Sequence, residues 1–578
     1  MKHIKNMGSA KTCWRLNRFA WAALLMAAGT AQAFQFDTGN DDLAIRWDNT
    51  VKGSTKLRTA KADAALNDSF RLLVPGVAAS AFPQALNFNA GDQNFQGRGI
   101  VSERLDWLSE FDVVFKRDFG LRLSGAGWYD QKLHERTQAT DGYVPQSPLN
   151  EFAQSTKTRA GRKVELLDAF VFGGWRFDNG IKLTSRLGRH GLQYGESLFF
   201  GDNGIARAQG PIDIDKLLAS PGAQFKEIIR PVPQLSAQVQ LSPEVSVGGY
   251  YQFSWEEDRL PAAGSYFSSV NIPWGSPMTE AMDLRASGAP FAALYTLSPG
   301  ADQKPKNSGQ FGLQLKWRVN EVDLGFYAAQ FHDKGGQLYG NLNPAGNFTV
   351  PGVGTLGTGQ WYYAFGQNIK TVGTSATYSV GDFNLAGEVS LRDDMPLRST
   401  NMIWATGFGG PPRMAKGKTA HANFSWLATF GPSFLSQESS FLGELAFNRV
   451  MSYDDPDHSL DEGRTRSATA IRLIFSPSYR QILPGLDLSV PLGVGYTLKG
   501  QSAITPGWGA QDTGDASIGL EGNYLGVWQF ALTYTKYLGK SVPFVDYSPL
   551  LTGGHAIFGH GNALGDRDFI ALSLRRTF

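Results

Sequence analysis

The sequence predicts an all-β protein, a transmembrane antiparallel β-barrel of about 18 strands with long extracellular loops. Three observations lead to this fold class. Polar and apolar residues alternate with a period of two over long segments, no apolar run behind the N-terminus is long enough for a membrane-spanning helix, and short turns alternate with long loops. A hydrophobic content of 42% with 67 glycines excludes a disordered chain and disfavours a helical bundle.

The first 33 residues have the pattern of a secretory signal peptide. Basic residues precede an apolar stretch from Phe19 to Ala28, and Ala31-Gln32-Ala33 forms a small-residue cleavage site. We therefore expect export to a Gram-negative outer membrane, with cleavage near Ala33 and a barrel formed by residues 34–578. The signal carries five basic residues and no acid, so its loss lowers the formal net charge from +2 to −3. This charge argues against a nucleic-acid partner.

The segment 43–58 shows the alternation best. Leu43, Ile45 and Trp47 begin a largely apolar face, whereas Arg46 and Asp48 lie on the opposite, polar face. Segment 102–117 repeats this pattern. Strands of soluble proteins have about 5 to 6 residues, whereas membrane strands need roughly 9 to 11. The lengths therefore favour strands that turn their apolar face to lipid and their polar face to a wet lumen.

Sixteen further strands are expected along the chain. They lie at about 120–132, 164–177, 181–190, 235–241, 245–255, 308–318, 322–333, 368–378, 383–392, 417–430, 440–450, 467–475, 486–495, 514–524, 527–537 and 568–578. The connections after even-numbered strands are short, the longest being 476–485, and the others run from sixteen to fifty-two residues. This division is typical of periplasmic turns and extracellular loops. The terminal Phe578 resembles the signal that the barrel-assembly machinery recognises.

Several blocks resemble a proteobacterial family of predicted outer-membrane proteins, the domain-of-unknown-function family 1302. They are Leu43–Val51, Arg104–Asp106, Glu110–Asp112, Arg186–His190, Tyr194–Phe200, Ala208–Pro211, Gly387–Ser390, Ala420–Asn423 and Leu483–Pro491. The resemblance implies movement of lipids or other hydrophobic compounds across the envelope. A periplasmic lipid carrier and an efflux pump are the partners that it suggests, by association and not by mechanism.

The polar face of the predicted barrel supplies the first candidate site. Its expected inward-facing charges are Arg46, Asp48, Arg104, Asp106, Glu110, Asp112, Arg122, Asp168, Arg186, Glu388 and Arg392. Rings of charged side chains select solutes in pores. The alternative is that acids and bases on neighbouring strands pair and hold the shape of the barrel, which the mixed signs favour.

The connection at 191–234 is the second candidate. Long loops of such barrels can fold into the lumen, and here the loop would form a constriction where Arg189, His190, Tyr194 and Glu196 meet the solute. Asp213 is suited to cap a short helix in it. The alternative is an external lid that packs for its own sake, and the constriction is favoured because Leu217, Leu218, Ile228 and Ile229 need an apolar environment.

Three weaker patterns complete the candidates. The acidic loop 453–458 offers oxygen ligands for Ca²⁺ or is a solvated loop, and His555 and His560 lie in a glycine-rich loop. His421, Asn423 and Ser425 share a strand face, as a hydrolytic site requires, but alternating strands produce such coincidences often. We therefore expect no metal, no cofactor and no catalytic residues.

The sequence thus predicts an outer-membrane channel for hydrophobic or amphipathic small molecules. A porin for small polar or anionic solutes is the first alternative, and an outer-membrane enzyme is the second. The expected partners are outer-membrane lipids, lipopolysaccharide and the barrel-assembly machinery, besides the lipid carrier and efflux pump named above.

Overall fold

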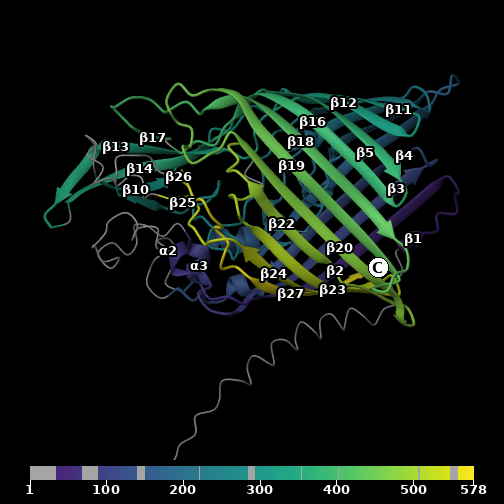
Figure 1. Cartoon of the computed structure of the whole chain (residues 1–578), viewed down its shortest axis with the longest axis horizontal. Helices are drawn as coiled ribbons and strands as arrows, with labels where there is room; N and C mark the ends of the chain where they lie inside the picture. Colours follow the sequence, from purple (N-terminus) through teal and green to yellow (C-terminus); the bar gives the residue numbers. More distant parts are fainter. Residues whose placement is uncertain are drawn as a thin grey trace, which may run out of the picture.

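A closed antiparallel barrel forms the body of the protein (Figure 1). The computed structural model describes residues 34–67, 89–139, 150–220, 222–283, 293–352, 354–400, 402–504, 508–546 and 557–578. The predicted signal peptide lies outside these residues. Within them, the barrel strands are β2 (Leu43–Arg58), β3 (Gly99–Phe115), β4 (Phe119–Asp130), β5 (Arg162–Arg176), β6 (Lys182–His190), β7 (Val232–Gln240), β8 (Val245–Gln252), β11 (Gln310–Val319), β12 (Val322–Phe331), β15 (Ile369–Val380), β16 (Phe383–Pro396), β18 (Lys416–Phe430), β19 (Glu438–Asp454), β20 (Ser467–Leu483), β21 (Leu486–Ser489), β22 (Leu492–Lys499), β23 (Gly514–Tyr524), β24 (Trp528–Leu538) and β27 (Phe569–Thr577).

Eighteen strand positions close the ring within the described residues, because β21 and β22 are two halves of one position. Strand β2 pairs with β3 on one side and with β27 on the other, so that Lys52 lies between Asp106 and Arg575. The short strand β1 (Phe34–Phe36) pairs with β2 just beyond the point where β27 stops. The predicted barrel of about 18 strands is thereby confirmed.

The alternation of the sequence becomes an apolar outer surface. Large apolar side chains at every second strand position are exposed, among them Trp107 at 48% and Leu313 at 61%. Such a band of exposed apolar and aromatic side chains faces lipid in outer-membrane barrels. Arg576, which breaks the alternation of the last strand, lies with its guanidinium carbon 5.0 Å from the ring centroid of Trp528.

All eighteen predicted strands are present, and β2 has the predicted bounds. The predicted ten-residue turn 476–485 is wrong, because β20 continues to Leu483 and leaves Pro484 and Gly485 as the turn. The strand predicted at 486–495 is interrupted at Val490 and Pro491, since proline has no N–H to donate to the ladder.

A second sheet, which the sequence analysis did not predict, is assembled from three long loops. Its strands, in spatial order, are β17 (Ile403–Ala405), β13 (Gln337–Val350), β14 (Gly354–Ala364), β10 (Leu294–Pro299) and β9 (Glu280–Asp283). It projects beyond one end of the barrel, whereas the C-terminus lies at the opposite end (Figure 1). An aromatic core that includes Trp274, Trp361 and Tyr363 packs at this sheet. The hairpin β25 (Val545–Asp546) and β26 (Ile557–Phe558) belongs to the last loop.

The helices are short and lie in the loops. They are α2 (Ala64–Asn67), α3 (Ala90–Asn94), η3 (Gln131–His134), α4 (Gln154–Thr156), η4 (Lys157–Gly161), η5 (Ile205–Ala208), α5 (Ile214–Ala219) and α6 (Phe225–Ile228). In the part of the chain that the structure describes, none is long and apolar enough to cross a membrane.

A buried ion cluster joins the top of β2 to the loops. Arg58 contacts Asp92 at 2.8 Å and Asp566 at 2.6 Å, and Arg567 contacts the same two carboxylates at 3.0 and 3.2 Å. The four residues are all buried. The cluster therefore fastens α3 and the last loop to the barrel wall.

Candidate functional site

Most of the predicted lumen charges pair with one another. Arg46 contacts Asp48 at 2.7 Å and Asp112 at 3.8 Å, and Arg104 contacts Asp106 at 2.6 Å. These pairs join residues of one strand or of neighbouring strands. This is what the alternative interpretation predicted, in which acids and bases pair to hold the shape of the barrel.

The pairing continues on the next strand. Arg122 of β4 contacts both Glu110 and Asp112 of β3 at 3.2 Å. Arg186 differs, because its guanidinium carbon lies 5.7 Å from the ring centroid of Phe170 and it forms no ion pair within the described residues. A paired wall presents little net charge to a solute, so these arginines and acids stiffen the barrel.

The connection between β6 and β7 crosses the lumen. Strand β6 is the fifth of the eighteen positions, whereas the contacts of residues 196–205 are with β16, β18 and β19, the eleventh to thirteenth positions. On these three strands Val389, Phe424 and Leu445 are exposed outward, so the buried residues between them face the interior. We call residues 191–231 the crossing segment.

Two carboxylates on the far wall hold the crossing segment. Glu388 accepts hydrogen bonds from the backbone N–H of Glu196 at 2.7 Å and of Ile205 at 3.2 Å, and from the Ser197 hydroxyl. Glu444 accepts from the N–H groups of Phe199 and Phe200, the second at 2.8 Å, and from the Asn423 amide at 2.7 Å. Each carboxylate thus satisfies backbone donors that would otherwise be buried without partners.

Asn203 forms the tip of the crossing segment. Its amide nitrogen donates to Asn423 Oδ1 at 2.7 Å, and its oxygen accepts from the Asn448 amide at 3.2 Å. Arg392 donates to the carbonyl oxygens of Asn203 at 2.8 Å and of Gly204 at 2.7 Å. Asn203 is fully buried, so the tip is embedded in the wall and does not lie loosely in the lumen.

The predicted residues of the second candidate lie at the end of β6 and at the start of the crossing segment. Arg189 forms an ion pair with Glu256 at 2.5 Å, and His190 shares a 2.8 Å hydrogen bond with Ser236. Tyr194 is buried against Tyr250 and Tyr327. Glu196 contacts Lys316 of β11 at 3.1 Å. Tyr194 and Glu196 therefore hold the start of the crossing segment against the wall, whereas Arg189 and His190 join β6 to the next loop and to β7.

The returning half of the segment carries α5 and α6. Asp213 caps α5 as predicted, with the N–H of Lys216 donating to its carboxylate at 3.0 Å. The Tyr537 hydroxyl of β24 donates to the carbonyl oxygen of Leu218 at 3.0 Å. Ile228 is buried in a cluster with Ile212, Ala206, Ala223 and Phe225, which gives the apolar residues of the segment their burial.

A large cavity lies on the loop side of the crossing segment. It encloses about 3370 Å³, part of it open to solvent. Its apolar lining comes from the crossing segment, the loop sheet and the wall strands, and includes Phe200, Leu217, Ile228, Trp274, Leu297, Trp361, Ile403, Trp508, Phe544 and Leu564. We call it the apolar cavity. On the barrel wall the lining includes Ala470 together with the ion pair of Arg472 and Asp515.

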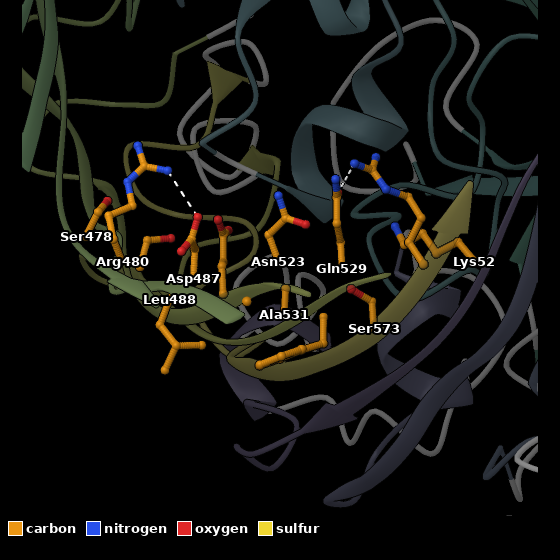
Figure 2. A pocket seen from close by; sticks show the side chains of 14 residues that line it. Lys52, Ser478, Arg480, Asp487, Leu488, Asn523, Gln529, Ala531 and Ser573 are labelled. Atoms are coloured by element: carbon orange, nitrogen blue, oxygen red, sulfur yellow. Dashed lines mark hydrogen bonds and ion pairs between the residues drawn. The ribbon is translucent and has the colours of Figure 1, made fainter. Parts of the chain in front are cut away.

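A second, polar space lies near the short turns, at the opposite end of the lumen. It encloses about 1050 Å³, again partly open to solvent, and we call it the vestibule. Figure 2 shows side chains of neighbouring strands pointing into it, with Arg480 and Asp487 on one side and Lys52 and Gln529 on the other. The register places Lys52, Arg575, Gln529, Asn523 and Asp487 in one row across five adjacent strand positions.

A buried charge cluster connects the crossing segment to the loops above it. Arg207 contacts Asp258 at 2.9 Å and Asp333 at 3.7 Å. Burial raises the pKa of Asp202 nearby, although Arg207 opposes this shift. Burial, together with the positive charge of Arg207, lowers the pKa of Lys334 to about 7. The cluster therefore holds a lysine whose charge depends on pH in the neutral range.

The remaining candidates have structural partners. His421 contacts Asn203 Oδ1 at 3.0 Å and Thr419 at 2.8 Å, so its ring is part of the anchor of the crossing segment. In the acidic loop, Asp457 pairs with Arg413 at 3.1 Å. His555 lies outside the described residues. Across the described ranges, no three His, Cys, Asp or Glu side chains are grouped to hold a metal ion.

Glu444, Asn203 and Trp508 were not among the candidates of the sequence analysis. Glu444 occupies an inward position between Leu442 and Ala446, and a lone acid on an apolar inner face was the available signal. Asn203 and Trp508 lie in loops, where alternation gives no information.

The comparisons with known proteins concern the whole chain. The sequence profile described as "Protein of unknown function (DUF1302)" matches residues 14–578. No curated protein matches. Among solved structures, OccAB2 of Acinetobacter baumannii is 9% identical with a TM-score of 0.41, covering 94% of this chain and 99% of its own. OccK9 (OpdG) of Pseudomonas aeruginosa is 10% identical with a TM-score of 0.38, covering 92% of this chain and 98% of its own.

Proposed function

The chain belongs to the DUF1302 family, and from this membership and its porin-like outer-membrane barrel we propose that it is a gated channel for hydrophobic or amphipathic small molecules. The observation that carries the proposal is the apolar cavity inside the barrel. A pore for polar solutes is lined by polar side chains throughout, whereas this cavity has three tryptophans, Trp274, Trp361 and Trp508, in its lining. Removal of apolar solute surface from water there favours binding.

The crossing segment is the gate in this proposal. It separates the apolar cavity from the vestibule, and Glu388 and Glu444 hold it closed through hydrogen bonds to its backbone. A solute arrives between the external loops, binds in the apolar cavity and passes to the vestibule when the segment moves. The paired arginines of the wall keep the barrel rigid while the segment moves.

A porin for small polar or anionic solutes is the second candidate function, and the polar vestibule favours it. The two differ in conductance, because an open porin gives large steady steps in a planar bilayer and a closed gate gives few. We propose no enzymatic role, since His421 and Asn423 already hold the tip of the crossing segment.

We further propose partners at the two ends of the barrel and around its wall. Outer-membrane lipids and lipopolysaccharide surround the wall and the long loops, and the barrel-assembly machinery inserts the chain after export and cleavage near Ala33. A periplasmic lipid carrier, supplied or emptied by an efflux pump, exchanges solute at the short turns.

The test is binding of 11-bromoundecanol, a neutral amphiphile whose bromine quenches tryptophan fluorescence on contact. The protein is held in lipid nanodiscs, and the saturable part of the quenching is measured. Ala563→Phe narrows the apolar cavity that Ala563 lines, and we expect it to weaken binding about fivefold or more. Ala65→Phe, at an exposed position of α2, is the matched control. Absence of saturable quenching, or equal binding by the two variants, would contradict the proposal.

A further inference from the structure

Three cations on adjacent strands of the inner wall differ from the paired arginines. Lys52 and Lys56 of β2 and Arg575 of β27 form no ion pair with a carboxylate within the described residues. Arg575 donates to the side-chain oxygen of Gln529 instead. The Lys56 ammonium lies 5.0 Å from the ring centroid of Phe267 and 5.8 Å from that of Phe569. We call these three residues the cationic track.

The cationic track runs from the vestibule to the apolar cavity. Lys52 and Arg575 are register partners that both line the vestibule. Lys56 is four residues further along the same face of β2, roughly 13 Å away for an extended strand. It contacts Phe267, which lines the apolar cavity. One row of positive charge therefore connects the two spaces past the crossing segment.

Other charged groups surround the track, and around Lys52 the cations outnumber the carboxylates. Arg104, Lys216 and Arg575 all act on Lys52, against the single carboxylate of Asp106, which Arg104 already contacts at 2.6 Å. Lys216 belongs to α5 of the crossing segment, which also carries Asp215, and the carboxylates of Asp215 and Asp130 act on Lys56 without forming an ion pair with it. The other vestibule acids, Asp487 and Glu521, lie on β21 and β23 on the far side, and Asp487 contacts Arg480 at 3.2 Å.

We propose that the cationic track selects amphiphiles with an anionic head group, a carboxylate, phosphate or sulfate. The apolar body of the solute occupies the apolar cavity, and its head group moves along Lys56, Lys52 and Arg575 into the vestibule. A partly buried ammonium group without an ion pair is costly to maintain, and the anion of the solute forms an ion pair with Lys56 and then with Lys52 during passage. This inference rests on the proposed channel function and specifies its substrate class.

The test compares probes that share one body and differ in head group. They are 11-bromoundecanoate, 11-bromoundecyl phosphate, 11-bromoundecyl sulfate, 11-bromoundecanol and 11-bromoundecyltrimethylammonium, each measured at pH 8 by saturable tryptophan quenching in nanodiscs. We expect the wild type to bind the anions about tenfold more tightly than the alcohol, since a charge-assisted hydrogen bond supplies that factor. The ranking among the three anions identifies the preferred head group.

The variant Lys52→Gln with Arg575→Gln should lower anion binding about tenfold and leave the alcohol unchanged within about twofold. Lys182→Gln removes an exposed lysine at the same end of the barrel, on β6, and is the control. Equal wild-type binding of anions and alcohol, or equal loss of all probes in the double variant, overturns the cationic track as a selector. Such results do not affect the proposed channel function. That function is contradicted only if neither the alcohol nor the anions bind saturably.

Discussion

The anchoring of the crossing segment by Glu388 and Glu444 can be tested by replacing both with glutamine. The two carboxylates accept six hydrogen bonds. Five come from residues 196–205 of the crossing segment, including the Glu196 N–H at 2.7 Å and the Phe200 N–H at 2.8 Å, and the sixth comes from the Asn423 amide. Glutamine preserves the volume of the side chain but replaces one acceptor oxygen by an NH2 group. That group turns its own hydrogens towards backbone donors.

The size of the shift towards the open segment follows from the hydrogen-bond acceptors that are lost. Each substitution removes at least one hydrogen bond to a charged group, worth about 1.5 to 3 kcal/mol, so the double variant loses about 3 to 6 kcal/mol. Because about 1.4 kcal/mol corresponds to a factor of ten, the equilibrium between closed and open segment shifts by about two to four orders of magnitude. The open state thus becomes far more populated, while the barrel strands keep their pairing.

The assay is single-channel conductance in planar lipid bilayers. We expect rare brief openings for the wild type and frequent large steps for Glu388→Gln with Glu444→Gln. Glu321→Gln, in the exposed turn between β11 and β12, removes a carboxylate away from the segment and should behave as the wild type. Heat-modifiable migration in gels verifies that each barrel is folded. A folded double variant with wild-type conductance would refute the view that these carboxylates hold the gate closed.

Two further predictions concern stability. Burial, and then the positive charge of Arg207, lower the pKa of Lys334 from 10.5 to about 7. Between pH 7 and pH 10.5 the unfolded chain therefore binds a proton at Lys334 that the folded chain lacks. The free energy of unfolding consequently rises with pH across that interval. Lys334→Met should flatten the rise of the urea unfolding midpoint between pH 7 and pH 9, and an unchanged slope would argue against the buried lysine. Asp92→Ala leaves the buried Arg58 and Arg567 with Asp566 alone and should cost about 3 to 5 kcal/mol in urea unfolding. Asp92→Asn keeps the shape of the side chain and removes its charge, so it separates the loss of charge from the loss of packing. If the urea unfolding midpoint of Asp92→Ala stayed close to that of the wild type, the cluster would not fasten α3 and the last loop to the barrel wall.

Local alternation explains why the barrel could be predicted. In β2, from Leu43 to Arg58, the alternation of polar and apolar residues is enough to predict which residues face lipid and which face the lumen. No other strand is needed, because neighbouring residues of a strand face opposite sides. The same argument failed at β20, which was predicted to end at residue 475 although the strand continues to Leu483.

For the crossing segment, the sequence predicted only a long loop whose apolar residues need burial, and not the residues that anchor it. Its anchor joins Phe200 to Glu444, residues 244 positions apart, and no local pattern relates them. Likewise, the strands β10 and β14 pair in parallel across the loop sheet although they belong to different loops. Long-range contacts of this kind depend on how the loops pack together, which alternation along a strand does not encode.

The sequence by itself determined the number of strands, the face that each residue presents and the side on which the long loops lie. Only the tertiary structure decided which inward charges neutralise one another and which stay unpaired. Arg104 and Lys52 look alike in the alternation, yet Arg104 contacts Asp106 whereas Lys52 faces Arg575 in the vestibule. The physical reason is that the face of a side chain follows from its own strand, while its electrostatic partner follows from strand register and from the loop that crosses the lumen.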